Sequence, residues 1–365
     1  MRILILNWRD IKNPKSGGAE VVTMAHAKAW AKKGNDVTWF TSSFLGGLKK
    51  ETIDGVKIVR QGNAFTVYLR APLFYLFSNT KFDLVIDEIH GLPFFTPLYV
   101  RKPKVVLIHE VAKEIWDYMY PFPVNVIGRF LETFYFKFYK NVLFWTDAAS
   151  TIDDLEALGI PRKNCVDIPC PVMNKTLEKL PEKQKTPTFI FVSRIVKMKG
   201  IEEVIKAFAL ILQKEKNAKL WIVGDGERKY KQYLKNLVKE LGCEDNIQFL
   251  GYVSDQDKLG YMGKSHIILH ASVREGWGLS TLEAASQATP SVAYDAPGLR
   301  DSIKNGKTGI LVKERTPENL AVASLGLLRD NKKYLLFQKA CLEWTKSLSW
   351  EKVTQTSLHL LEQAL

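Results

Sequence analysis

The chain has 365 residues, 46% of them hydrophobic and 25% charged, and its formal net charge is +13. This length favours two domains, and the composition excludes a largely disordered chain. The positive charge is spread over both halves, which suits an anionic small ligand, an anionic membrane surface or plain solubility. Because zinc-finger spacing, an RNP-like strand and a basic zipper are all missing, we expect no nucleic-acid partner.

The four cysteines form no C-x-x-C pair, so we expect a reducing compartment rather than a disulfide framework or a zinc site. The first residues enter a strand directly, without a signal-peptide pattern. No apolar run reaches the length that crosses a membrane. These features predict a cytoplasmic protein.

The N-terminal half is predicted to alternate strands and helices. A strand over 2–6, a helix over 19–33 that ends in two lysines and a glycine, and a strand over 36–41 form a βαβ unit, which implies a parallel sheet. Further strands are predicted at 56–60, 84–86, 105–109 and 148–152. Asp153 and Asp154 are expected to cap a short helix after the last of these.

The C-terminal half predicts a second series of the same kind. Residues 173–186 lose apolar content and gain lysines, which indicates an interdomain linker. Strands are predicted at 189–192, 220–223, 247–250, 267–271 and 291–294, alternating with helices at 201–212, 229–241, 256–263 and from about Ser280. The fold class is therefore α/β, with two doubly wound Rossmann-like domains, 1–180 and 187–345, facing a central cleft.

Residues 274–286, REGWGLSTLEAAS, carry the clearest functional pattern. Gly276 and Gly278 permit a tight turn, and Leu279 and Ser280 begin a helix whose free amides and dipole suit a diphosphate. Glu275 stands before this turn. Each carboxylate of the segment has two oxygens, which can accept hydrogen bonds from vicinal hydroxyls of a sugar.

Glu283 completes the pattern one turn into that helix, with seven residues between it and Glu275. Structural alternatives exist for both acids. Ser280 and Glu283 also match a capping box, and Glu275 could be a solvated loop acid.

This segment resembles the retaining glycosyltransferases of family 4, which have the GT-B fold and two glutamates at this spacing. The resemblance implies that Glu275 contacts the sugar of a nucleotide-sugar donor and that Glu283 contacts its ribose. It also implies that the chain is a hexosyltransferase.

Arg194 and Lys199 lie between a predicted strand end and a helix start, in FVSRIVKMKG. Two cations there suit a diphosphate that gains charge as it leaves, although a solvated basic loop is the alternative. The family has an arginine and a lysine at this spacing, where they stabilise the pyrophosphate.

Gly17 and Gly18 follow the first strand and let the backbone approach a ligand closely, or they form a plain turn. Their place resembles the glycine loop of the family at the donor phosphate and the acceptor. Glu20 either orients the acceptor or only starts the helix.

His109 closes the apolar run VVLIH and could point into a crevice or be a satisfied core histidine. By resemblance it would contact the donor sugar near the anomeric centre. Gly224 and Asp225 would support donor binding, and Val253 would lie near the base.

The resemblance covers nearly the whole chain and implies that a final helix, within 346–365, crosses back to the N-terminal domain. Ala288, Ala296-Pro297-Gly298 and Asp301 depart from the commoner family residues. These departures bear on the identity of the donor sugar rather than on the class of reaction.

The aromatic and basic stretch 118–140 is a candidate for membrane contact, with a core helix as the alternative. It includes Phe134, Tyr135, Phe136, Phe138 and Tyr139 with Lys137 and Lys140 among them. Phe74, Tyr75, Phe77, Phe94 and Phe95 could extend an apolar acceptor surface. We therefore expect a peripheral position on the inner face of the membrane.

These patterns predict a retaining glycosyltransferase that moves a hexose-type sugar from a UDP- or GDP-sugar to a glycan or lipid-linked acceptor. We expect no cofactor and no metal, since Asp255-Gln-Asp257 precedes a surface helix and Gly224-Asp225-Gly226 is not a dinucleotide fingerprint. A nucleotide-sugar epimerase of the same fold and an inactive nucleotide-sugar-binding subunit are the alternatives.

Overall fold

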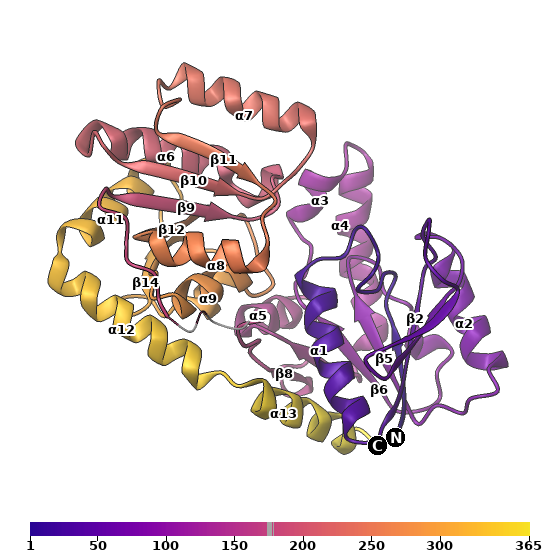
Figure 1. Ribbon diagram of the computed structural model, residues 1–365. Coiled ribbons are helices and arrows are strands. Elements are labelled where there is room, and N and C mark those ends of the chain that lie inside the picture. The colour runs from indigo at the N-terminus through magenta and orange to yellow at the C-terminus, as the bar shows by residue number, and fades with distance from the viewer. Residues whose placement is uncertain (174–176, 178) are drawn as a thin grey trace. The chain divides into compact units, whose positions relative to one another are not determined.

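The computed structural model describes residues 1–173, 177 and 179–365. Its chain forms two compact units, Met1–Cys170 with Ser349–Leu365, and Pro171–Leu348 (Figure 1). The boundary falls ahead of residue 180, where the first domain was predicted to end. The predicted linker, 173–186, includes residues 174–176 and 178, which lie outside the described residues.

The first unit is built on one sheet of eight strands in the order β3-β4-β2-β1-β5-β6-β7-β8. All neighbouring strands are parallel except the antiparallel pair β3–β4. The strands are β1 (Arg2–Leu6), β2 (Asp36–Thr41), β3 (Lys50–Ile53), β4 (Val56–Arg60), β5 (Leu84–Ile89), β6 (Lys104–Ile108), β7 (Leu143–Thr146) and β8 (Cys165–Asp167).

Helices cover both faces of this sheet because its strands are apolar on both sides. Ile3 and Ile5 of β1 join the core beneath the first helix, whereas Leu4 and Leu6 join the core on the opposite face. The helices are α1 (Gly18–Lys32), α2 (Val67–Phe77), η1 (Thr96–Leu98), α3 (Ile115–Met119), α4 (Val124–Tyr135), η2 (Phe136–Tyr139), α5 (Ala149–Ala157), η3 (Arg162–Asn164) and α13 (Trp350–Gln363).

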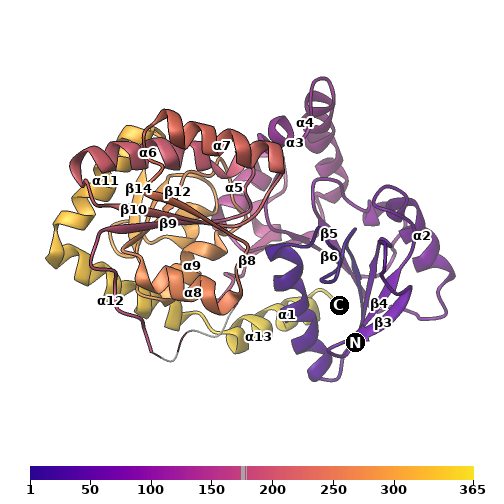
Figure 2. The same ribbon diagram turned by 45° about the horizontal axis from the view of Figure 1, so that its top comes forward.

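The last helix, α13, completes the first unit although it comes from the far end of the sequence. It lies beside α1 in both ribbon views (Figures 1 and 2). Ser357 Oγ contacts His26 Nδ1 at 2.9 Å and accepts a hydrogen bond from Trp30 Nε1 at 3.1 Å. Leu361 is fully buried in the same core.

The strand predicted at 148–152 is wrong. Those residues lie mainly in helix α5, and the strand is β7, at Leu143–Thr146. The aromatic run of β7 suits the buried sheet, and the extended Ala148 then precedes the helix. Asp153 and Asp154 lie inside α5 rather than capping a later helix.

The second unit is built on one sheet of six parallel strands in the order β11-β10-β9-β12-β13-β14. The strands are β9 (Thr188–Val192), β10 (Lys219–Val223), β11 (Ile247–Gly251), β12 (Ile267–His270), β13 (Ser291–Tyr294) and β14 (Gly309–Val312). Chain order reverses direction beside β9, which has β10 on one side and β12 on the other. Ligands of doubly wound sheets bind at the carboxyl ends of strands at such a point.

The helices of the second unit also cover both faces of its sheet. Phe189 and Phe191 face the core of α6, while Ile190 and Val192 face that of α8. The helices are η4 (Lys197–Lys199), α6 (Ile201–Lys214), α7 (Arg228–Glu240), α8 (Asp255–Lys264), α9 (Leu279–Ser286), α10 (Leu299–Ser302), α11 (Pro317–Arg329) and α12 (Asn331–Ser347). The predicted α/β fold with two parallel-sheet domains is confirmed.

In the described part of the chain, every helix is too short or too polar to traverse a bilayer.

Candidate active site

The second unit holds an ion pair between Lys199 and Glu275 at the carboxyl edge of its sheet. Lys199 ends η4 after β9, and Glu275 lies in the loop after β12. Lys199 Nζ donates to Glu275 Oε2 at 2.7 Å, and Ser272 Oγ donates to Oε1 at 2.7 Å. Both side chains are largely buried, at 10% and 17% exposed. Two of the predicted site residues therefore form one fixed cation–carboxylate group.

Two glycines allow the backbone to hold this pair. Gly200 has φ 68°, and a Cβ on it would lie 2.0 Å from the Ala271 carbonyl oxygen. Gly298 has φ 78°, and a Cβ there would lie 2.1 Å from the Glu275 carbonyl oxygen. Only glycine fits these close approaches, so both glycines help to position the Lys199–Glu275 ion pair. Sequence reasoning noticed Gly298 only as a departure from the family pattern and missed Gly200.

The environment of Glu275 keeps its carboxyl ionised. Burial by itself raises the pKa of Glu275. The charge and hydrogen bond of Lys199, together with the Ser272 hydroxyl, outweigh that effect and bring the pKa below its ordinary value. The site therefore presents a carboxylate acceptor at neutral pH.

Helix α9 begins directly after this group. Its N-cap is Gly278, with φ 88° and ψ 55°, so the first amides are not capped by a side chain. Ser280 Oγ lies 3.3 Å from His270 Nε2. The amino end of α9 thus combines amides that no side chain caps with a hydroxyl, which is suitable for an anionic group.

The capping-box alternative for Ser280 and Glu283 is wrong, because the N-cap is Gly278, two residues before the Ser280 that the motif requires there. Glu283 instead accepts a hydrogen bond from Lys258 Nζ of α8 at 2.8 Å and is 8% exposed. Sequence reasoning missed Lys258.

The other predicted donor residues follow the carboxyl ends of β9, β10 and β11. Arg194 is exposed, and no described residue forms an ion pair with it. Asp225 is exposed and pairs with Lys231 at 2.5 Å, which lowers the pKa of Asp225. Val253 is half-buried. The structure therefore brings these side chains to one sheet edge, but it does not join Arg194 to Glu275.

Gly224 has a packing role besides any contact with a ligand. Its φ is 135°, and a Cβ on it would lie 1.8 Å from the Ser193 carbonyl oxygen. Its amide donates to the Gly251 carbonyl at 2.8 Å. The glycine is thus required where the loops after β9, β10 and β11 meet.

In the first unit, His109 follows β6 and lies among carboxylates. Its Nδ1 contacts Asp147 Oδ2 at 2.5 Å, and its Nε2 is 3.5 Å from Glu88 Oε1. His90 Nε2 is 2.9 Å from the same Glu88 oxygen. Glu88 and Asp147 were missed, although each lies at or just after a strand end, where polar residues gather at the carboxyl edge.

These contacts shift the pKa values of both His109 and Glu88. Burial lowers the pKa of His109, but Asp147 and Glu88 more than compensate, and the pKa lies well above its ordinary value. Burial raises the pKa of Glu88, yet His109 and His90 bring it down to about 2. The structure thus favours an imidazolium held between two carboxylates.

We expect the Asp147–His109 pair to make stability depend on pH. Because the pKa of His109 is raised in the folded state, its contribution is complete below the unfolded pKa of about 6.5 and is lost as pH rises through the folded pKa. Asp147→Asn should flatten this decline. Urea unfolding at a series of pH values above about 6 measures it. Asp36→Asn, which breaks an exposed pair with Lys57, is the control; identical slopes in all three proteins would refute the assignment.

Glu88, His90 and His109 are also the described residues that could hold a metal ion. One ligand atom from each lies within 4.8 Å of the others. Two imidazoles and a carboxylate suit a divalent transition metal, and Asp147 would orient the His109 ring. In this structure the same atoms contact one another and form the ion-pair network described above.

Gly17 and Gly18 lie at the start of α1, which begins at Gly18. The Gly17 amide donates to Glu20 Oε2 at 2.6 Å, and Arg9 Nε donates to Glu20 Oε1 at 2.6 Å. Glu20 is fully buried. This geometry favours the alternative in which Glu20 starts the helix, and an acceptor role for it stays a prediction.

Two known families match consecutive parts of the chain. Residues 16–173 match Glycosyltransferase Family 4, and residues 172–343 match Glycosyl transferases group 1.

Curated proteins give matches over about half of the chain. An uncharacterized glycosyltransferase of Methanocaldococcus jannaschii is 30% identical over 48% of this chain and 45% of its own length. A poly(glycerol-phosphate) alpha-glucosyltransferase of Bacillus subtilis is 29% identical over 44% of this chain and 23% of its own length. The matches thus span less than half the length of these relatives.

Solved structures share the fold over nearly the whole chain. Sucrose-phosphate synthase from Thermosynechococcus elongatus has a TM-score of 0.81 at 18% identity, covering 99% of this chain and 98% of its own. Anabaena HepE in complex with UDP-glucose has a TM-score of 0.75 at 16% identity, covering both chains fully.

Proposed function

Since the chain belongs to the glycosyltransferases of family 4, with the group 1 family in its C-terminal half, we propose that it is a retaining hexosyltransferase. It would move a sugar from a UDP- or GDP-sugar to a hydroxyl of a glycan or lipid-linked acceptor. The observation that carries this proposal is the buried Lys199–Glu275 pair, followed by the amino end of α9, which no side chain caps.

This arrangement matches the charge changes of glycosyl transfer. The leaving nucleotide diphosphate gains negative charge, which Lys199, the α9 amides and the exposed Arg194 would stabilise. Glu275 would accept hydrogen bonds from sugar hydroxyls, and Glu283 from the ribose. The two acids each keep a lysine partner, so a ligand would meet carboxylates already fixed in place.

The first unit would supply the acceptor side and the histidine. We propose that His109, held as an imidazolium by Asp147 and Glu88, contacts the donor sugar near its anomeric centre. Its positive charge would favour the departing diphosphate as well. Similarity to the complex of HepE with UDP-glucose supports a nucleotide-sugar donor.

A ligand screen followed by an assay tests the proposal. We expect either UDP and UDP-sugars or GDP and GDP-sugars to raise the melting temperature of the protein, because a ligand that binds only the folded state stabilises it. Transfer of labelled sugar to an acceptor should persist in EDTA, since no divalent metal is required for the charge control proposed here. Donor-only conversion into an epimer, or binding without transfer to any acceptor, would instead support one of the two alternatives.

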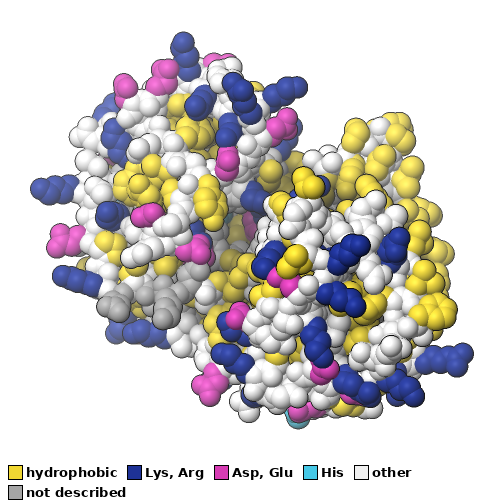
Figure 3. Space-filling model, turned by 45° about the vertical axis from the view of Figure 1, so that its right-hand side comes forward, with side chains coloured by type: hydrophobic (Ala, Val, Ile, Leu, Met, Phe, Trp, Pro, Cys, Tyr) yellow, Lys and Arg dark blue, Asp and Glu magenta, His cyan; other side chains and the backbone are white. Residues whose placement is uncertain are grey.

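We also propose that the first unit contacts the membrane surface through α4 and α2. Exposed hydrophobic side chains gather along one edge of this unit (Figure 3). On α4, Ile127, Phe130 and Phe134 are 52%, 68% and 47% exposed, whereas its polar Glu132 is buried. Glu132 accepts from the backbone amides of Ala112 and Lys113, so the helix turns apolar residues outward.

Within stretch 118–140, the core alternative holds for some aromatic residues, and the exposure of others supports the proposed membrane contact. Tyr135, Phe136 and Tyr139 are buried in the core, while Phe134 and Phe138 are about half exposed. The extension to Phe94 is wrong, because that ring is 2% exposed under β1 and β2.

Helix α2, unlike the buried Phe94, exposes apolar side chains to solvent. Its exposed hydrophobic residues are Leu69, Leu73, Leu76 and Phe77. Arg70 on the same helix and Lys140 after η2 are exposed cations that suit anionic lipids.

Replacing Phe130 and Phe134 by serine should weaken binding to vesicles of phosphatidylcholine and phosphatidylglycerol by about tenfold or more, since each buried phenylalanine contributes ~1.5–3 kcal/mol. Co-sedimentation measures this change. Val322→Ser, at a 68% exposed position on α11, is the matched control. Equal sedimentation of the wild type and the double variant would contradict membrane contact through α4.

A further inference from the structure

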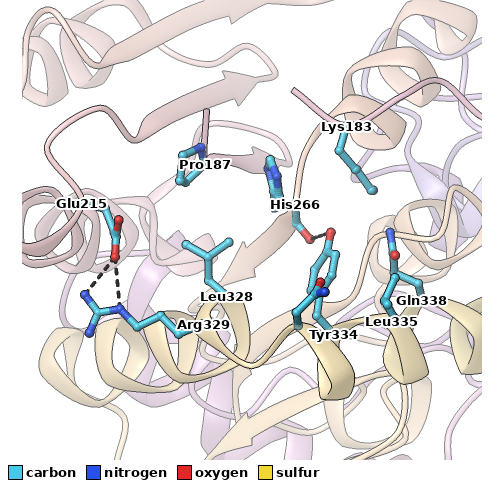
Figure 4. A pocket seen from close by; sticks show the side chains of 10 residues that line it. Lys183, Pro187, Glu215, His266, Leu328, Arg329, Tyr334, Leu335 and Gln338 are labelled. Carbon is cyan, nitrogen blue, oxygen red and sulfur yellow. Dashed lines mark hydrogen bonds and ion pairs between the residues drawn. The ribbon is translucent and has the colours of Figure 1, made fainter. Parts of the chain in front are cut away.

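A cavity of about 530 Å³ opens in the second unit beside the starts of β9 and β12 (Figure 4). Its walls include Lys183, Pro187, His266, Leu328, Tyr334 and Leu335. Arg194, Lys199 and Glu275 follow the opposite ends of these strands. The cavity is therefore separate from the proposed donor site, and nothing in that function uses it.

Lys183 brings to this cavity an amino group whose charged form has no counter-charge. Its Nζ donates to the Ser265 carbonyl at 2.7 Å and to Thr289 Oγ1 at 2.6 Å. An ammonium group has three N–H donors, so one is left for a further acceptor. No carboxylate of a described residue forms an ion pair with Lys183.

The surrounding titratable groups leave this charge uncompensated. His266 Nδ1 accepts from the Thr188 amide at 3.1 Å, which leaves the proton of the neutral ring on Nε2. Burial lowers the pKa of His266, as does Lys183. Arg329 is paired with Glu215 at 2.8 Å. Tyr334 donates to the His266 carbonyl at 3.0 Å.

The nearby Cys341 thiol also stays neutral, because burial raises its pKa to about 12. Burial lowers the pKa of Lys183 to about 7. An anion beside the ammonium would favour its charged form and raise that pKa again. Binding of an anion would therefore be coupled to uptake of a proton at slightly alkaline pH.

We propose that this cavity binds a small carboxylic acid anion with an apolar body. Its carboxylate would accept from the free N–H of Lys183 and from His266 Nε2, and its apolar part would lie against Pro187, Leu328 and Leu335. Figure 4 shows the ring of His266 between Pro187 and the Lys183 side chain, with Leu328 facing the hollow. The cavity size is in the range of small-molecule sites.

Calorimetric titration of the full chain with benzoate tests this proposal, with benzamide as its uncharged match. We expect benzoate to bind with a Kd on the order of 1 mM, as for a fragment-sized ligand, and benzamide at least about tenfold more weakly. Titrations near pH 8 in two buffers of different ionisation enthalpy should show net proton uptake on benzoate binding. Saturating UDP should leave the benzoate affinity unchanged.

Lys183→Met should remove benzoate binding, and Lys264→Met, an exposed neighbour at the end of α8, should retain it. Circular dichroism and the melting temperature establish that the variants fold. If Lys183→Met does not fold, proton uptake by the wild type decides the question. Equal binding of benzoate and benzamide, binding without proton uptake, or no benzoate binding up to about 10 mM would overturn the proposal. Because the readout is direct binding, a chain without transferase activity would leave this result intact.

Discussion

Replacing Lys199 by methionine is expected to lower kcat for sugar transfer by about 10²–10³-fold, the usual cost of losing one preorganised group at a developing charge. The variant also leaves Glu275 as a largely buried carboxylate without its cation. Breaking such a pair from one side costs about 3–5 kcal/mol of stability. Reduced activity alone would therefore not separate a chemical role of Lys199 from a structural one.

The double variant Lys199→Met/Glu275→Gln makes that separation. Neutralising both partners removes the buried unpaired charge, so we expect most of the lost stability to return while transfer stays low. Urea unfolding and single-turnover transfer measure the two quantities. Lys206→Met, which breaks an exposed pair with Glu203, is the control and should change neither appreciably. Recovery of transfer in the double variant would limit the pair to a structural role.

The second large effect is expected from Gly298→Ala. A methyl group there would lie 2.1 Å from the Glu275 carbonyl oxygen, in a backbone conformation with φ 78° that alanine rarely adopts. Either the loop of Glu275 or that of Gly298 must move, at a cost of about 2–5 kcal/mol. Since Glu275 would contact the donor sugar, we expect kcat/KM to fall by about tenfold or more, as small displacements of positioning groups do.

Gly326→Ala is the matched control for this substitution. Gly326 lies within helix α11, and outside its chain neighbours and the backbone of its own helix no atom of a described residue lies within 4 Å of a Cβ built on it. Alanine should stabilise the helix there by about 0.5–1 kcal/mol and leave transfer unchanged. If Gly298→Ala has the stability and kcat/KM of the wild type, the steric account of this loop is wrong.

The fold was predictable where hydrophobic periodicity is strong. In the second unit the strands from β9 to β13 were predicted to within about one residue at each end, because each is a short apolar run bounded by polar residues, Gly or Pro. The error at 148–152 arose where an aromatic strand runs directly into a helix that begins with small residues. Local pattern alone does not fix the boundary between such neighbours.

The candidate site was predictable in its residue types but not in its pairings. Glu275 and Lys199 were both singled out, yet their direct contact depends on Gly200 and Gly298, whose roles arise from close approach to distant backbone. Likewise, Glu132 of α4 is buried and accepts hydrogen bonds from two amides of a preceding loop, which the sequence analysis did not predict. Such interactions join positions far apart in sequence, and one sequence carries no local signal for them.

The position of helix α13 at the end of the chain determines when the first unit can finish folding during synthesis. The hydroxyl that contacts His26 and Trp30 belongs to Ser357, which the ribosome adds after the whole second unit. Until then α1 lacks the apolar cover of Leu358 and Leu361. The first unit therefore completes its hydrophobic core only after the second unit has been translated. Until then the apolar face of α1 must stay protected from aggregation while the second unit folds.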